Sequence, residues 1–267
     1  SAPCLRAAWP ATVQRLNEAN ASANYSLSKH MMGNANDHAP SASWPYPRRV
    51  AHRCGGKLAP ENTLSGFDAC LQHGYRMVEF DAKLSADNEV FLLHDDTLER
   101  TTSGHGAAAA YTWEQLSALD AGAWFDRRFA GERLPTLAEV AARCERDHIA
   151  ANIEIKPCPG RESLTGQLVA QAALDLWRLQ TPLLSSFSYD ALAAARDTAP
   201  ALPRGMLSLH ADHQHLSEPL VAAIHAAGLR VLAYTVNEPA RARELEQWGV
   251  DMICTDRLDL IGRDIGP

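Results

Sequence analysis

The sequence predicts an α/β protein built as a single β/α barrel of the TIM type with one small insertion. From Val50 onward, short apolar runs alternate with longer segments of helical periodicity, which favours βα units over a β-sandwich. Three apolar runs far apart in the chain end in side chains that carry acid/base or metal chemistry: His52, the pair Glu79 and Asp81, and Glu154. A β/α barrel assembles its site from polar groups at the ends of separate strands.

Eight apolar runs are expected to form strands, and eight is the number of strands in a TIM barrel. These runs are residues 49–53, 77–82, 90–94, 151–156, 183–187, 205–209, 230–236 and 252–255. Helices are expected at residues 63–73, 136–146, 165–178, 189–197, 217–227 and 239–248. Glycine follows three of these helices directly, as it often does at helix C-termini: Gly74, Gly228 and Gly249. A further short helix is predicted at residues 5–17.

One connection is too short for a parallel crossover, which takes a dozen residues or more. Residues 82 and 90 are therefore expected to join through an antiparallel hairpin, with Asp87-Asn88 as a two-residue turn. This register places Asp81 opposite His94 and brings the carboxylates of the preceding strand beside that histidine. Residues 96–135 then form the insertion.

Composition limits the class of protein. With 267 residues, 46% of them hydrophobic, the chain suits one large domain, which we place at residues 44–267. Residues 1–43 are rich in Ala, Asn and Ser and are expected to be an N-terminal extension outside the barrel. A net charge of −7 with both signs mixed argues against nucleic-acid binding.

The cysteines and the lack of long apolar runs predict a cytoplasmic protein. Six cysteines are scattered without C-x-x-C spacing, which favours reduced thiols over disulfides or a zinc site. No run approaches the roughly 18 apolar residues of a membrane span, and no signal peptide is recognisable, so neither stable membrane insertion nor secretion is expected. The sequons at Asn20 and Asn24 are accordingly expected to be unglycosylated. Homo-oligomerisation stays open.

Three carboxylates predict a metal site. Glu79 and Asp81 are two residues apart on a strand, so their side chains share one face and repel each other unless a cation joins them. Glu154 supplies a third carboxylate from another strand. Oxygen ligands without Cys or His suit one hard divalent cation, Mg²⁺ or Ca²⁺. The alternative is that they are surface charges, which their apolar neighbours disfavour.

Two histidines and two cations end the same strands. His52 and His94 are each either a structural histidine or a catalyst, and their convergence on the carboxylates favours general acid and base catalysis. Arg53 and Lys156 either neutralise the carboxylates or hold a phosphodiester, and their place beside the histidine and Glu154 favours phosphate binding. Three aromatic residues either line the alcohol side of the pocket or belong to the core: Phe187, Tyr234 and Trp124.

These motifs, in this order, resemble the glycerophosphodiester phosphodiesterase family, and most closely its bacterial cytosolic branch. The resemblance runs from about residue 44 to residue 261 and rests on residues 50–53, 60–63, Glu79 and Asp81, 93–95, 100–102, 154–156, 186–187, 234–237 and 254–256. It implies metal ligands at Glu79, Asp81 and Glu154, a general acid/base pair at His52 and His94, and an insertion over the mouth of the barrel. It also implies that Glu61 is a partner of the metal or of Arg53. The alternative is that Glu61 only interacts favourably with the positive end of a helix dipole.

Two departures from the family are visible. The glycine that usually follows His-Arg is Cys54 here, followed by Gly55-Gly56, so the loop is expected to turn at a shifted position. The segment 204–216 is shorter than in the relatives that the chain resembles.

The implied activity is metal-dependent hydrolysis of glycerophosphodiesters to sn-glycerol 3-phosphate and an alcohol. Attack by the neighbouring glycerol hydroxyl, through a cyclic phosphate, is chemically favoured because an intramolecular nucleophile has a high effective concentration. One alternative is a lysophospholipase D-like or cyclising phosphodiesterase. The other is a binding protein without catalysis, which is expected to lack one of the five acid/base and metal residues. All five are present.

Overall fold

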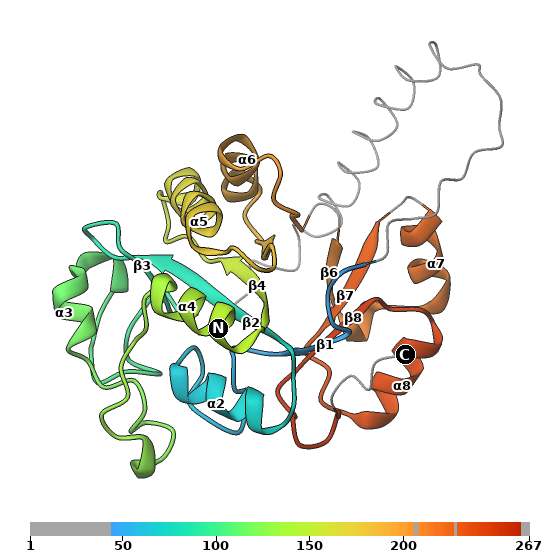
Figure 1. The fold of residues 1–267 in the computed structure, drawn as a ribbon, viewed down its shortest axis with the longest axis horizontal. Helices are drawn as coiled ribbons and strands as arrows, with labels where there is room; N and C mark the ends of the chain where they lie inside the picture. The colour runs from blue at the N-terminus through green and yellow to red at the C-terminus, as the bar shows by residue number, and fades with distance from the viewer. Residues whose placement is uncertain (1–43, 206–207, 227–228, 263–267) are drawn as a thin grey trace. The chain divides into compact units, whose positions relative to one another are not determined.

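The computed structural model describes residues 44–205, 208–226 and 229–262 (Figure 1). The chain separates into two units after Pro45, and every element named below belongs to the second unit. The predictions for residues 1–43, including the helix at residues 5–17 and the two sequons, lie outside the described residues.

A curled, mainly parallel sheet forms the core of a β/α barrel. The described residues contain eight strands: β1 (Arg49–Ala51), β2 (Met77–Leu84), β3 (Val90–Leu92), β4 (Ala150–Ile155), β5 (Leu183–Ser185), β6 (Ser208–Asp212), β7 (Arg230–Tyr234) and β8 (Met252–Thr255). Seven of them run parallel in the order β5-β4-β2-β1-β8-β7-β6. A parallel bridge between Leu184 and Arg204 brings the segment before β6 alongside β5. The predicted fold class is therefore confirmed.

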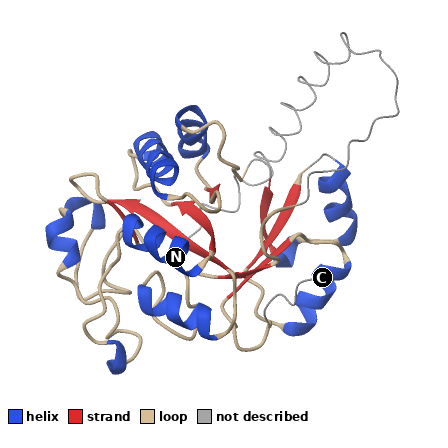
Figure 2. Cartoon of the chain, viewed as in Figure 1, coloured by secondary structure: helices blue, strands red, loops and turns tan. Residues whose placement is uncertain are grey.

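Helices cover the convex side of this sheet (Figure 2). They are α2 (Leu64–Gln72), α4 (Leu137–Asp147), α5 (Glu162–Leu176), α6 (Tyr189–Thr198), α7 (Glu218–Ala226) and α8 (Pro239–Gln247), while α3 (Trp113–Ser117) lies in the insertion beside β3. All six helices predicted within the described residues are present, and their starts follow from capping: the side chain of Thr63 accepts from the Gly66 amide, and Thr136 and Glu139 form a capping box. The short α3 was not predicted.

The β2–β3 hairpin is present, but its predicted register is wrong by one residue. The pairs are Ala82–Leu92 and Leu84–Val90, so Asp81 lies opposite Leu93 and not opposite His94. Five residues separate β2 from β3, and the Ser85 amide donates to the Glu89 carbonyl at 3.0 Å, which leaves three residues in the turn rather than two. The last of the three, Asn88, adopts a left-handed φ of 70°. β3 is therefore antiparallel and does not count among the parallel strands of the barrel.

The insertion packs on this hairpin and reaches the loop after β1. Its apolar side chains form a cluster with β3 that includes Phe91, Leu98, Leu116 and Leu134. Ser65, at the start of α2, hydrogen-bonds Glu132 through its amide and its hydroxyl. The insertion thus lies against the segment that follows β1.

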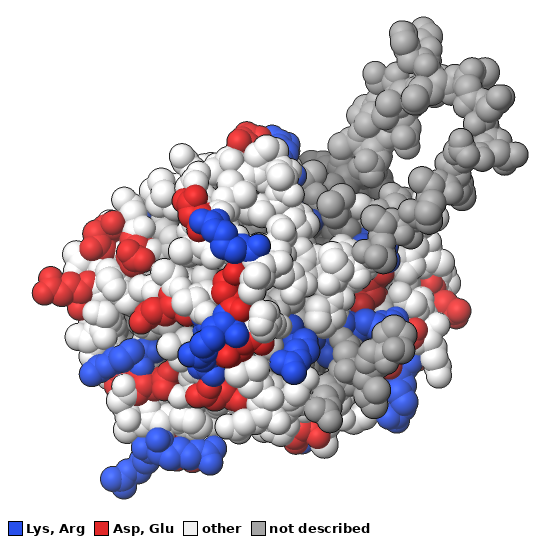
Figure 3. All heavy atoms as spheres, in the orientation of Figure 1, with Lys and Arg blue, Asp and Glu red and all other residues white. Residues whose placement is uncertain are grey.

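The surface carries both signs of charge. On the face shown in Figure 3, Lys and Arg side chains lie among Asp and Glu side chains. Among the described helices, none has the length and apolar character required to cross a bilayer.

Candidate active site

Strand order brings the predicted residues together. β1 lies between β8 and β2, and β4 pairs with β2 so that Asp81 is directly beside Glu154. Parallel neighbours end on the same side of the sheet, so side chains at these carboxyl ends share one face of the barrel. The residues His52 and Asp256, which directly follow β1 and β8, reach the same place.

The three predicted carboxylates form a cluster. One oxygen from each of Glu79, Asp81 and Glu154 lies within 4.8 Å of the other two. Glu79 is 4% exposed and Asp81 1% exposed. Burial raises the pKa of Glu79 to about 8, and the charge of Asp81 adds to that effect. Burial and the same aspartate also raise the pKa of Glu154.

Asp81 behaves differently from its two neighbours. Burial alone raises its pKa, but Lys156, His94 and Arg53 outweigh that effect and hold the pKa below its usual range. Asn62 fixes its position, because the amide Nδ2 donates to Asp81 Oδ2 at 2.8 Å and Oδ1 accepts from the Asp81 amide at 3.0 Å. Asn62 was not predicted to belong to the site, although it lies in segment 60–63, one of those that carry the family resemblance.

The cluster has the properties of a divalent-cation site. All three ligand atoms that it offers are carboxylate oxygens, and Glu79 Oε1 is buried without a hydrogen-bond partner. A buried carboxylate oxygen with no donor is costly unless a cation meets it. These residues therefore fit a hard divalent ion.

His52 is held by a carboxylate that the sequence analysis missed. Its Nδ1 lies 2.6 Å from Asp256 Oδ1, and its Nε2 lies 3.9 Å from Glu79 Oε2. Burial lowers the pKa of His52, but the hydrogen bond to Asp256 and the charge of Glu79 outweigh it, so the pKa is raised. Asn237 in turn donates to Asp256 Oδ2 at 3.1 Å. The available signal was the position of Asp256 at a strand end, which it shares with His52.

His94 has a parallel arrangement. Its Nδ1 lies 2.7 Å from Asp95 Oδ1. Burial lowers the pKa of His94, although Asp81 and Asp95 act against that effect. Asp95 itself accepts from Arg100 Nε at 2.5 Å, and the Arg100 hydrogen bond is the main reason that the pKa of Asp95 is low.

Arg100 connects the two sides of the site. Its two terminal nitrogens donate to the two oxygens of Glu61 at 2.8 and 2.7 Å. Arg53 Nη1 donates to the same carboxylate at 2.9 Å. A continuous chain of charged hydrogen bonds therefore runs from Arg53 through Glu61, Arg100 and Asp95 to the second histidine.

The two predicted phosphate-binding cations border the cluster. Lys156 Nζ lies 2.6 Å from Glu154 and 3.7 Å from Asp81, and Arg53 Nε lies 3.7 Å from Asp81. Arg53, Cys54 and Gly56 adopt left-handed φ values of 48°, 69° and 56°, while Gly55 does not. The loop therefore turns at the shifted position of Gly56, as expected, but it also turns at Cys54, whose amide donates to the Glu79 carbonyl at 3.0 Å.

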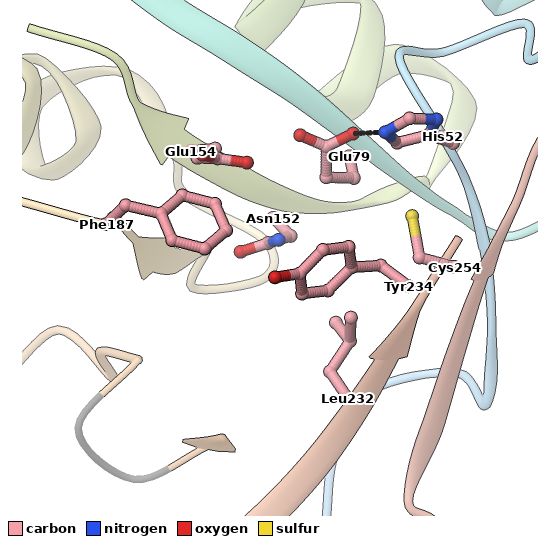
Figure 4. Close-up of a pocket in the computed structure, with 8 residues that line it drawn as sticks. All are labelled: His52, Glu79, Asn152, Glu154, Phe187, Leu232, Tyr234 and Cys254. Carbon is pink, nitrogen blue, oxygen red and sulfur yellow. Dashed lines mark ion pairs between the residues drawn. The ribbon is translucent and has the colours of Figure 1, made fainter. Parts of the chain in front are cut away.

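A small cavity of about 30 Å³ opens beside the carboxylates (Figure 4). The side chains that line it are His52, Glu79, Asn152, Glu154, Phe187, Leu232, Tyr234 and Cys254. The Phe187 and Tyr234 rings meet edge to face at 5.9 Å, and Lys156 Nζ lies 5.3 Å from the Phe187 ring centre. Trp124 is not among the lining residues: it is 39% exposed, and its indole donates to the Ala121 carbonyl within the insertion.

Comparison with known proteins identifies the family. The sequence model of the glycerophosphoryl diester phosphodiesterase family matches residues 52–217 and 208–260. The chain belongs to this family. It is an enzyme, a phosphoric diester hydrolase that acts on glycerophosphodiesters.

Individual relatives agree with this membership. A putative glycerophosphodiester phosphodiesterase of Bacillus subtilis is 34% identical over 239 residues, covering 80% of this chain and 96% of the relative. A glycerophosphodiester phosphodiesterase of Caldanaerobacter subterraneus is 31% identical, covering 78% and 93%. Among solved structures, a phosphodiesterase of Oleispira antarctica in complex with the product sn-glycerol-3-phosphate matches with a TM-score of 0.78 and 32% identity, over 81% of this chain and 95% of that one.

Proposed function

We propose that the chain hydrolyses glycerophosphodiesters to sn-glycerol 3-phosphate and an alcohol. The observation that carries this proposal is the carboxylate cluster with two carboxylate-held histidines at the same strand ends. The product-bound relative from Oleispira antarctica supports the nature of the product. Five buried free thiols are consistent with a reducing compartment, and we propose a cytoplasmic location.

In this proposal, Glu79, Asp81 and Glu154 hold one divalent cation, Mg²⁺ or Ca²⁺. When bound, such an ion acidifies a coordinated hydroxyl and offsets negative charge on the phosphoryl group. Arg53 and Lys156 orient the phosphodiester, and Glu61 fixes the Arg53 fork through the 2.9 Å hydrogen bond. Phe187 and Tyr234, which line the same cavity, contact the alcohol.

The histidines move the protons. Each is fixed through Nδ1 by an aspartate, which leaves Nε2 free to accept or donate. We assign one as the base that takes the proton of the neighbouring glycerol hydroxyl, and the other as the acid that protonates the leaving alcohol. The hydroxyl oxygen bonds to phosphorus as the bond to the alcohol breaks, and water then opens the cyclic phosphate.

The test is release of sn-glycerol 3-phosphate from glycerophosphocholine and glycerophosphoethanolamine, measured with and without a chelator. Exhaustive chelation should abolish release, and Mg²⁺ or Ca²⁺ should restore it. A substrate in which the attacking hydroxyl is replaced by hydrogen should bind and turn over very slowly. Turnover of this deoxy analogue at the parent rate would eliminate the cyclic intermediate, and full activity in the metal-free form would eliminate the cation.

Turnover of lysophosphatidylcholine in preference to glycerophosphocholine would instead favour the lysophospholipase D-like alternative.

A further inference from the structure

A second group of metal-binding atoms overlaps the carboxylate cluster. His52, Glu79 and Cys254 each offer one ligand atom, and the three atoms lie within 4.8 Å of one another. They come from three adjacent strands: His52 directly follows β1, Glu79 lies within β2 and Cys254 lies within β8. Cys254 is 1% exposed, and its thiol points toward the side of the cavity where His52 and Glu79 lie (Figure 4).

Two of these ligands are already oriented. His52 Nδ1 lies 2.6 Å from Asp256 Oδ1, so this contact holds the ring and leaves Nε2 as the nitrogen available to a metal. Nε2 lies 3.9 Å from Glu79 Oε2. A carboxylate that fixes one imidazole nitrogen while the other binds metal is the usual outer support of a zinc-binding histidine. Glu79 Oε2 faces His52 and is held by the Arg53 amide, which donates to it at 3.0 Å, so the carboxylate ligand is oriented as well.

The donor set decides the class of metal. One nitrogen, one oxygen and one sulfur suit Zn²⁺ and its thiophilic analogue Cd²⁺, whereas Mg²⁺ and Ca²⁺ take oxygen ligands. The ligands come from separate strands, so C-x-x-C spacing, whose absence argued against zinc in the sequence, is not required. The pairing of β2, β1 and β8 brings these ligands together although they are far apart in the sequence.

We propose that His52, Glu79 and Cys254 form an inhibitory site for one thiophilic divalent ion such as Zn²⁺. The ion forms bonds to Nε2, to the carboxylate and to sulfur, and the thiol proton passes to solvent. Binding takes His52 out of proton transfer and Glu79 out of the three-carboxylate cluster. The inhibitory effect rests on the proposed function, but the binding site does not.

Cadmium titration of the full-length chain tests binding directly, because a cadmium–thiolate bond gives an ultraviolet charge-transfer absorption. The first equivalent of Cd²⁺ should produce this absorption in the parent protein. Cys254→Ser should lose it at that stoichiometry, and His52→Ala should keep the thiol but bind Cd²⁺ at least ~10-fold more weakly. Cys158→Ser is the matched control, since Cys158 is also buried but lies near Lys83, outside the cluster.

Zinc inhibition is measured on the parent and on the two cysteine variants, each relative to its own rate in saturating Mg²⁺. Cys254→Ser should need at least ~10-fold more Zn²⁺ for half inhibition than the parent, while Cys158→Ser should match the parent. Retention of the one-equivalent absorption and of zinc sensitivity in folded Cys254→Ser would overturn the site. Activation by Zn²⁺ would overturn the inhibition. An inactive parent that still binds Cd²⁺ through Cys254 would refute the proposed function and leave the site standing.

Discussion

Replacing Asp256 by Asn tests how His52 is held, because the surroundings of Asp256 determine how a new amide must lie. Asp256 Oδ1 accepts from His52 Nδ1 at 2.6 Å, while Oδ2 accepts from Asn237 Nδ2 at 3.1 Å and lies 3.9 Å from Lys57 Nζ. A donor and a cation thus face Oδ2. In Asp256→Asn, the single remaining oxygen should take that side, and the new NH₂ group should face His52.

An NH₂ group donates to Nδ1, so the proton of the neutral imidazole moves to Nε2. Nε2 then points a proton toward Glu79 and cannot accept one. The histidine also loses a charge-assisted hydrogen bond, worth about 1.5–3 kcal/mol. At ~1.4 kcal/mol per factor of ten, kcat should fall by roughly 10- to 100-fold.

The assay is steady-state release of sn-glycerol 3-phosphate at saturating Mg²⁺. KM should change little, because Asp256 does not line the cavity. Asp259→Asn is the matched control: it makes the same chemical change on a nearby carboxylate that accepts from Arg257 at 2.9 Å. A kcat within twofold of the parent in folded Asp256→Asn, or an equal loss in Asp259→Asn, would refute the orientation argument.

The remaining predictions concern the cation, the second histidine, the charged chain and stability. Glu154→Gln should stay folded and bind Mg²⁺ at least ~10-fold more weakly, as measured by the Mg²⁺ concentration that gives half of the maximal rate. If that concentration is unchanged, Glu154 is not a metal ligand. His94→Ala should lower kcat by roughly 10² without changing the urea midpoint, and near-normal kcat would make this histidine structural. Arg100→Ala should release Glu61 and lower kcat/KM about tenfold. The free energy of unfolding should fall by less than ~1 kcal/mol, because the Arg100 side chain is 43% exposed. An unchanged kcat/KM would show that the hydrogen bonds from Arg53 to His94 position neither substrate nor catalyst. Burial raises the pKa of Asp251, but hydrogen bonds from a backbone amide, an arginine and a histidine outweigh it and lower the pKa. The stability contributed by the Asp251 carboxylate is therefore present above its unfolded pKa of about 3.9 and is lost as pH falls through the folded pKa. The loss of unfolding free energy caused by Asp251→Asn, measured by urea unfolding, should accordingly be smaller at about pH 3 than at about pH 7. An equal loss at both pH values would contradict this prediction.

Periodicity and strand ends predicted most of the architecture. The helices after β1 and β4 bury apolar residues at helical spacing, and α2 begins at a Thr cap while α5 begins with an acidic first turn, all of which are local signals. The carboxylate cluster was predictable because Glu79 and Asp81 alternate with apolar residues on one strand. Its third member, Glu154, was predictable because parallel strands end on one face.

What the sequence did not reveal depends on neighbours distant along the chain. The hairpin register depends on one residue, Asn88, adopting a left-handed conformation, which sequence allows but does not require. The contact between Asp256 and His52 exists because β8 pairs with β1, and closure of the sheet is not a local property. Arg100 likewise meets Glu61 only because the insertion folds back on the loop after β1.

The charges of the site argue that cation and substrate bind cooperatively. Arg53 and Lys156 already lie within 4 Å of carboxylates, so neither offers uncompensated positive charge to a phosphodiester. Without an added cation, the cluster reduces its repulsion by keeping Glu79 protonated, as its pKa of about 8 indicates. In the proposed function, a divalent ion held by these carboxylates would replace that proton and supply positive charge to the phosphodiester. Each ligand should therefore tighten the other, and by linkage the two affinities should rise by the same factor.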